Sequence, residues 1–130
     1  MSPHKYSQLI VASVLALIVG VLAHDVHWGD IGPGNKVVAF ERVTRKPNPL
    51  KLQFSILTNV KYPPKGHTSI YNLTGIRLVD NGLPNNYGYA VLKSGGPGYP
   101  YSTIEIKSQR NKPINMSISY YASALKNRRY

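Results

Sequence analysis

The stretches Leu50-Lys51-Leu52-Gln53-Phe54-Ser55-Ile56 and Ile114-Asn115-Met116-Ser117-Ile118-Ser119-Tyr120 carry apolar side chains at every second position. Alternate residues of a β-strand point to opposite faces of its sheet, so this pattern predicts strands with one buried face. The first stretch shows the clearest alternation, and Ser102–Ser108 shows a weaker one. Less regular segments rich in β-forming residues are Lys36–Val43, Ile70–Val79 and Tyr87–Lys93, and Asp25–Gly29 is a candidate for a further short strand.

The segments between these stretches are rich in glycine, proline and asparagine, which are typical of turns. Six to eight short strands with such spacing predict an all-β fold, a single-domain antiparallel β-sandwich or barrel. Successive antiparallel strands reverse direction, so the loops at 30–35, 61–68 and 95–100 are expected at one end. The opposite end is then expected to carry four basic residues, Arg45, Lys46, Arg110 and Lys112.

Length and composition narrow the function classes. The chain has 130 residues, which suits one domain, and it has no cysteine. A disulfide framework, a thiolate zinc site and a cysteine nucleophile are therefore excluded. Sixteen Lys and Arg stand against five Asp and Glu, a formal net charge of +11. Five acids leave few candidates for catalysis by paired carboxylates.

Residues 1–23 have the pattern of a secretory signal peptide. Lys5 precedes an uncharged apolar run from Leu9 to Ala23, which is shorter than the about 20 residues that a spanning helix needs. Cleavage between Ala23 and His24 is predicted, leaving a β domain at 24–122 and a basic tail at 123–130. The protein is then expected to be secreted and extracellular, with no membrane span. The alternative interpretation is an N-terminal anchor or a buried helix.

The positive charge suits a polyanionic or acidic partner. Arg45, Lys46, Arg110 and Lys112 are the candidate polyanion-binding patch. No helix-turn-helix, zinc-finger or RNA-binding signature accompanies them, so sequence-specific binding of nucleic acid is not expected. The alternative, which the composition favours, is a well-solvated surface whose charge serves solubility.

Two sequons, Asn72-Leu73-Thr74 and Asn115-Met116-Ser117, are candidate N-glycosylation sites in a secreted chain. The alternation around Asn115 predicts that its side chain faces water.

A copper site is a further, weaker hypothesis. After cleavage, His24 would offer its imidazole and a free α-amine, and His27 or His67 would complete a copper brace. Solvated histidines at a mobile end are the more ordinary interpretation. No nucleophile elbow, phosphate loop or HExxH is present. A non-enzymatic protein without a cofactor is therefore expected.

A family resemblance rests on several segments between Trp28 and Ala122. They are Trp28-Gly29, Ile76-Arg77-Leu78-Val79-Asp80, Ala90–Tyr99 with its Gly95-Gly96-Pro97-Gly98 turn, Ser108-Gln109-Arg110 and Ile114–Tyr121. This order resembles the arthropod family named for multiprotein bridging factor two, many of whose members are labelled probable salivary secreted peptides. Where that family tends to have glycine after Ser-Gln-Arg, this chain has Asn111-Lys112-Pro113.

The resemblance implies two roles and no catalytic site. Most relatives look like small secreted proteins, which implies binding of an extracellular protein or polyanion. The namesake looks like a transcriptional co-activator that bridges a DNA-bound regulator and the basal machinery. The expectation from the whole sequence is a secreted, non-enzymatic binding protein. The co-activator and the copper-binding β-sandwich are its alternatives.

Overall fold

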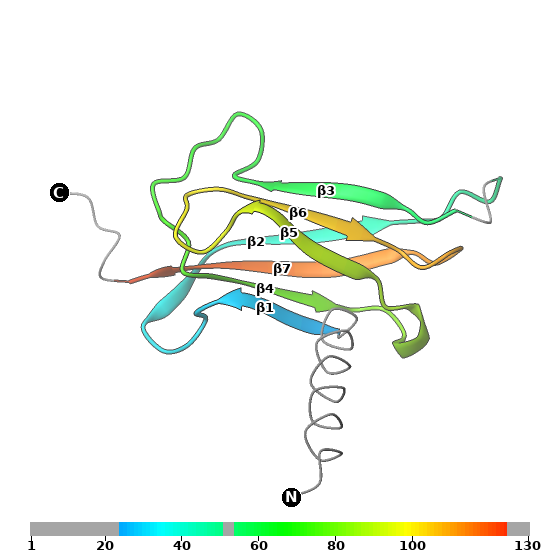
Figure 1. Ribbon diagram of the computed structural model, residues 1–130, viewed down its shortest axis with the longest axis horizontal. Coiled ribbons are helices and arrows are strands. Elements are labelled where there is room, and N and C mark those ends of the chain that lie inside the picture. Colours follow the sequence, from blue (N-terminus) through cyan, green and yellow to red (C-terminus); the bar gives the residue numbers. More distant parts are fainter. Residues whose placement is uncertain (1–23, 51–53, 125–130) are drawn as a thin grey trace, which may run out of the picture.

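The computed structural model describes residues 24–50 and 54–124, and these form an antiparallel β-sandwich (Figure 1). The predicted signal peptide at 1–23, its cleavage site at Ala23 and residues 125–130 of the predicted tail lie outside the described residues. The elements are β1 (Asp25–Gly29), β2 (Asn35–Arg45), β3 (Leu57–Tyr62), β4 (Gly75–Asp80), the 3₁₀ turn η1 (Pro84–Asn86), β5 (Tyr89–Gly95), β6 (Ser102–Lys107) and β7 (Ile114–Ser123).

The strands form two sheets, which confirms the predicted all-β class and decides for a sandwich over a closed barrel. One sheet has the order β1-β4-β7-β2 and the other β3-β6-β5, with every neighbouring pair antiparallel. None of the described segments is a helix with the length and hydrophobicity to cross a membrane.

Strand β7 shows how the alternation builds the core. Its residues from Ile114 to Ala122 alternate strictly between buried and half-buried positions, as the sequence predicts. The buried set of β7 packs with Ile76 and Leu78 of β4 and with Ile104 and Ile106 of β6, all at most 1% exposed. The core therefore lies between the central strands of the two sheets.

The prediction of a strand at Leu50–Ile56 is wrong. Residues 54–56 form no strand, residues 51–53 lie outside the described part, and Leu50 and Phe54 are 92% and 67% exposed. The strand instead begins at Leu57, opposite Lys107. The reason is the partner strand: β6 ends at Lys107, so the ladder between β3 and β6 ends with the pair Leu57 and Lys107.

The predicted distribution of loops between two ends is confirmed. The β1–β2, β3–β4 and β5–β6 connections lie at one end of the sandwich, together with the end of β7. The β2–β3, β4–β5 and β6–β7 connections lie at the other, on the right in Figure 1. We call this second end the basic end, after Arg45, Lys46, Lys107, Arg110 and Lys112.

Candidate binding surface

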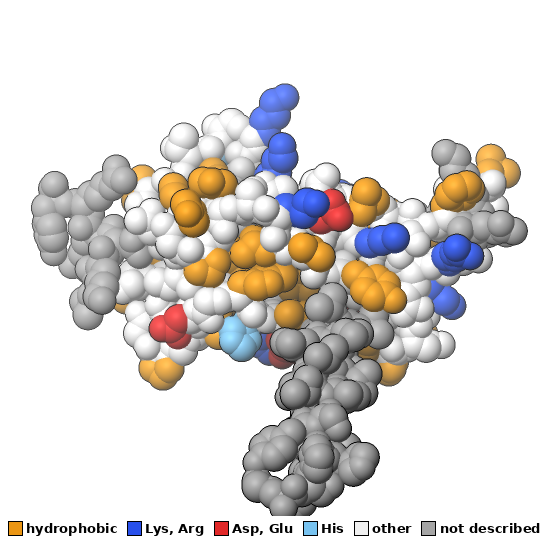
Figure 2. Space-filling view, in the orientation of Figure 1, with side chains coloured by type: hydrophobic (Ala, Val, Ile, Leu, Met, Phe, Trp, Pro, Cys, Tyr) orange, Lys and Arg blue, Asp and Glu red, His pale blue; other side chains and the backbone are white. Residues whose placement is uncertain are grey.

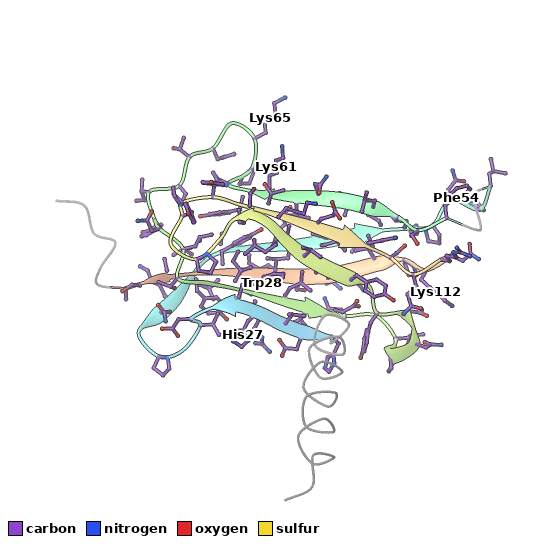
Figure 3. All side chains as sticks on the ribbon, viewed as in Figure 1. His27, Trp28, Phe54, Lys61, Lys65 and Lys112 are labelled. Carbon is purple, nitrogen blue, oxygen red and sulfur yellow. The ribbon has the colours of Figure 1, made fainter. Side chains whose placement is uncertain are left out.

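The four predicted basic residues lie at the end of β2 and in the turn that precedes β7, the strand with which β2 pairs. Arg45 is the last residue of β2 and pairs with Ile114, the first residue of β7. Arg110 and Lys112 lie in the turn that leads from β6 into Ile114, and Figure 3 labels Lys112 at this end. The structure therefore brings the predicted patch together at one end, while binding of a polyanion there stays a prediction.

The β6–β7 turn is fixed by its own hydrogen bonds. The amide of Lys112 donates to the carbonyl of Gln109 at 3.1 Å, and the side-chain amide of Gln109 donates to the carbonyl of Tyr87 at 2.8 Å. Asn111 has φ of 64°, the only positive value at a non-glycine residue in the described part. Asparagine tolerates this left-handed conformation better than most residues, so it replaces the glycine of the resembling family without loss of the turn.

Lys107 is a basic residue that the sequence analysis did not single out. It is exposed, ends β6, and lies in register with Leu57 on one side and Tyr89 on the other. A hollow of ≈520 Å³ opens beside it, lined by Ser55, Tyr89, Lys107, Ser108, Gln109 and Arg110. The alternation of Ser102–Ser108 places Lys107 on the outer face, but its neighbours follow only from the strand order.

A second hollow lies between the ends of β2 and β7. It measures ≈430 Å³ and is lined by Thr44, Arg45, Lys46, Pro113, Ile114 and Asn115. The basic end thus presents two open hollows, each with two cationic side chains, on either side of the β6–β7 turn.

Two carboxylates, those of Asp25 and Glu105, pair with cations outside the basic end. Asp25 accepts two hydrogen bonds from Arg77, at 2.7 and 3.0 Å, and this contact lowers the pKa of the carboxyl group. Glu105 lies 3.6 Å from the ammonium of Lys93. In the described part of the chain, no cation of the basic end pairs with a carboxylate. Arg45 instead donates a hydrogen bond to the carbonyl of Thr44 at 2.8 Å.

Asp80 also lies at the basic end, but its carboxylate is buried and forms no ion pair with the surface cations in the described part of the chain. It is 7% exposed, and its two oxygens accept hydrogen bonds from the amides of Gly82 and Gly88, both within 2.9 Å. The carboxylate of Asp80 therefore holds the turn that connects β4 to β5.

Large apolar side chains share the basic end with the cations. Phe54, Leu57 and Tyr89 are 67%, 59% and 40% exposed. Figure 2 shows hydrophobic and basic side chains side by side at the right of the molecule, and Figure 3 labels Phe54 there. The surface therefore combines positive charge with apolar area.

The three histidines of the copper hypothesis do not converge. The ring of His24 stacks on Tyr87 at 5.2 Å, and His27 is exposed on β1 opposite Arg77 (Figure 3). His67 lies in the β3–β4 loop, at the opposite end from His24. Within residues 24–50 and 54–124, no group of three or more His, Cys, Asp or Glu is placed to hold a metal ion.

The two sequons lie in different settings. Asn115 is half-buried on the outer side of β7, where its side-chain oxygen accepts a hydrogen bond from Arg42 at 3.5 Å. Asn72 is exposed in the β3–β4 loop, next to buried Leu73. Both side chains are accessible, and their glycosylation stays a prediction.

Comparison with known proteins gives one match. The model of the family described as Transcription activator MBF2 matches residues 28–122, from Trp28 in β1 to Ala122 in β7. No curated protein and no solved structure matches the chain. The match covers most of the chain and nearly all of the sandwich, and the resemblance to the bridging-factor-two family is thereby confirmed. The chain belongs to the MBF2 family.

Proposed function

We propose that this protein activates transcription by binding other proteins, joining a DNA-bound regulator to basal factors, and that it performs no catalysis. The observation that carries the proposal is the match of the MBF2 transcription activator family over residues 28–122. A bridging protein needs contact surfaces rather than reactive groups. Support for this comes from the basic end: among residues 24–50 and 54–124, Arg45, Lys107 and Arg110 form no ion pair with a carboxylate, and exposed Leu57 lies in register with Lys107.

A reporter assay tests this proposal. Residues 24–130 are fused to a heterologous DNA-binding domain and expressed with a reporter gene that carries its sites. Recruitment by the fused domain replaces recruitment by the natural regulator, so we expect reporter expression well above that with the DNA-binding domain alone. Expression equal to that control, with the fusion protein present in nuclei, would contradict the proposal.

A second candidate function is binding of a partner outside the cell. It is favoured by the uncharged run from Leu9 to Ala23, which has the length and the ending of a secretory signal. In this case residues 1–23 are removed, and the same surfaces of the sandwich contact an extracellular protein or polyanion. The two candidates use one fold and differ in the compartment where it acts.

The location of the protein and its N-terminal residue distinguish the two candidate functions. A full-length chain with a C-terminal tag is expressed, and nuclei and medium are analysed separately. Protein in the medium that begins at His24 supports the extracellular function. Glycosidase treatment of this protein gives a second readout. A decrease in mass that is absent in Asn72→Gln or Asn115→Gln would show that the chain passed through the secretory pathway. Intact protein in nuclei supports the activator.

A further inference from the structure

The outer face of the β3-β6-β5 sheet carries a cation between two apolar side chains. At the basic end, Lys107 lies in register with Leu57 of β3 and with Tyr89 of β5. All three residues are exposed, Leu57 to 59% and Tyr89 to 40%. Neighbouring strands lie about 4.8 Å apart, so a ligand that contacts the ammonium group also reaches an apolar side chain on each side.

Two further residues extend this surface. Arg110 lines the same hollow as Lys107 and Tyr89. Phe54, 67% exposed, precedes β3 by three residues. Glu105 is the acidic residue of the next register row, and it lies 3.6 Å from Lys93, so it leaves the two cations of the hollow unneutralised. We call Phe54, Leu57, Tyr89, Lys107 and Arg110 the mixed surface.

The apolar side chains decide which anion fits. A nucleic acid backbone or a sulfated glycan would satisfy Lys107 and Arg110, but its sulfates or phosphates gain nothing from Leu57 and Phe54. Burial of exposed apolar area is favourable, and a carboxylate accepts charge-assisted hydrogen bonds from lysine and arginine. A peptide with both kinds of side chain satisfies the whole surface.

We propose that the mixed surface binds an acidic segment of a protein partner, in which carboxylates alternate with large apolar side chains. This inference rests on the proposed function in one respect, that the protein acts by binding a protein partner. An extended segment with an acid beside an apolar residue places the carboxylate at Lys107 or Arg110. Its apolar side chain then lies on Leu57, Tyr89 or Phe54.

Fluorescence anisotropy with synthetic peptides tests the proposal on the protein as recovered from expressing cells. One labelled peptide alternates glutamate with leucine, and a second replaces every leucine with serine at the same charge. We expect the leucine peptide to bind roughly tenfold more tightly than the serine peptide. Equal affinity for the two peptides would overturn the proposal, as would tighter binding of heparin or duplex DNA that depends on Lys107 and Arg110.

Matched variants locate the site. Lys107→Glu with Arg110→Glu removes both cations of the hollow, and Lys61→Glu with Lys65→Glu makes the same charge change at exposed positions nearer the other end. The first pair of substitutions is expected to lower the affinity for the leucine peptide by roughly tenfold, and the second pair by less than about twofold. Equal weakening by both would show a net-charge effect and overturn the assignment. Circular dichroism confirms that each variant is folded.

The outcome is separable from that of the proposed function. If the fusion activates the reporter and Lys107→Glu with Arg110→Glu activates equally, the mixed surface is wrong and the activator stands. If the leucine peptide binds at the mixed surface but no fusion activates the reporter, the proposed binding surface is supported and the proposed activator function is wrong.

Discussion

The ring of Tyr62 on β3 stacks on the ring of Tyr120 on β7, with centroids 4.3 Å apart and an angle of 21° between the planes. The two residues belong to different sheets, so this contact joins the layers of the sandwich. Tyr120 is 1% exposed, and the hydroxyl of Tyr62 donates to Ser69 in the β3–β4 loop. One aromatic pair thus ties both sheets to the loop at the end opposite the basic residues.

Tyr120→Ala is expected to be among the most damaging core substitutions. It removes a fully buried ring and the stacking contact of that ring with Tyr62, which costs about 3–5 kcal/mol of unfolding free energy. Tyr120→Phe keeps the ring and is expected to cost less than about 1.5 kcal/mol. Urea unfolding followed by circular dichroism measures both. A loss for the phenylalanine variant as large as that for alanine would contradict the importance of the stacked ring.

The same residue predicts sensitivity to alkali. Burial raises the pKa of Tyr120 above its ordinary value, because desolvation disfavours the phenolate. A raised folded-state pKa means that the contribution to stability is complete below about pH 10 and is lost as the pH rises through the folded pKa. We therefore expect the unfolding free energy to fall above about pH 10, and to fall less in Tyr120→Phe. Tyr101→Phe, at a 45% exposed position, is the control and should follow the wild type.

The misplaced strand shows which part of the fold the alternation does not determine. Of the predicted inward residues, Ile56 packs against the core and Val60 continues its side of the strand, whereas Leu50 and Phe54 are exposed. Where pairing begins is set by β6, more than forty residues along the chain. The last contact is made by Ser108: its side-chain oxygen accepts a hydrogen bond from the amide of Ile56 at 2.7 Å. Strand β7 was predictable because its ladders with β2 and β4 together extend over the whole of the patterned segment Ile114–Tyr120.

Ser108→Ala tests this account of where β3 begins. The hydroxyl is 1% exposed, so its removal leaves the amide of Ile56 without its partner and costs about 1–3 kcal/mol. Faster hydrogen exchange of the Ile56 and Leu57 amides is expected as well. Ser119→Ala, on the outer side of β7, should change the unfolding free energy by less than about 0.5 kcal/mol. An equal loss in the two variants would contradict the role of Ser108.

The positive charge of the candidate site could be predicted from the sequence, but the side chains that lie next to one another in it could not. Four of its cations follow from strand direction alone, because antiparallel strands send alternate loops to the same end. Lys107, Leu57 and Tyr89 become neighbours only through the order β3-β6-β5, which no local pattern contains. The charge alone predicts a polyanionic or acidic partner, and the apolar neighbours are the reason for proposing an acidic protein segment.

The hydrogen bonds of Asp80 predict how the stability of the β4–β5 connection depends on this residue. Asp80→Ala leaves the amides of Gly82 and Gly88 without their acceptor, the second in a buried setting, and is expected to cost about 2–4 kcal/mol. Asp30→Ala is the matched control, because Asp30 is exposed and accepts one hydrogen bond, from Gly32. Its cost should stay below about 1 kcal/mol. Thermal unfolding of the two variants measures the difference, and a larger loss for Asp30→Ala would refute the account.

Asn111 carries the last prediction, since its φ of 64° is one that β-branched residues strongly resist. Asn111→Gly should leave the unfolding free energy within about 1 kcal/mol of the wild type, because glycine adopts this conformation without strain. Asn111→Val should lower it by about 1–3 kcal/mol and weaken any ligand held by Arg110, which the same turn positions. Asn59→Val, at an exposed position of β3, controls for the new side chain and should be neutral. If Asn111→Val is as stable as Asn59→Val, the turn does not depend on the left-handed residue.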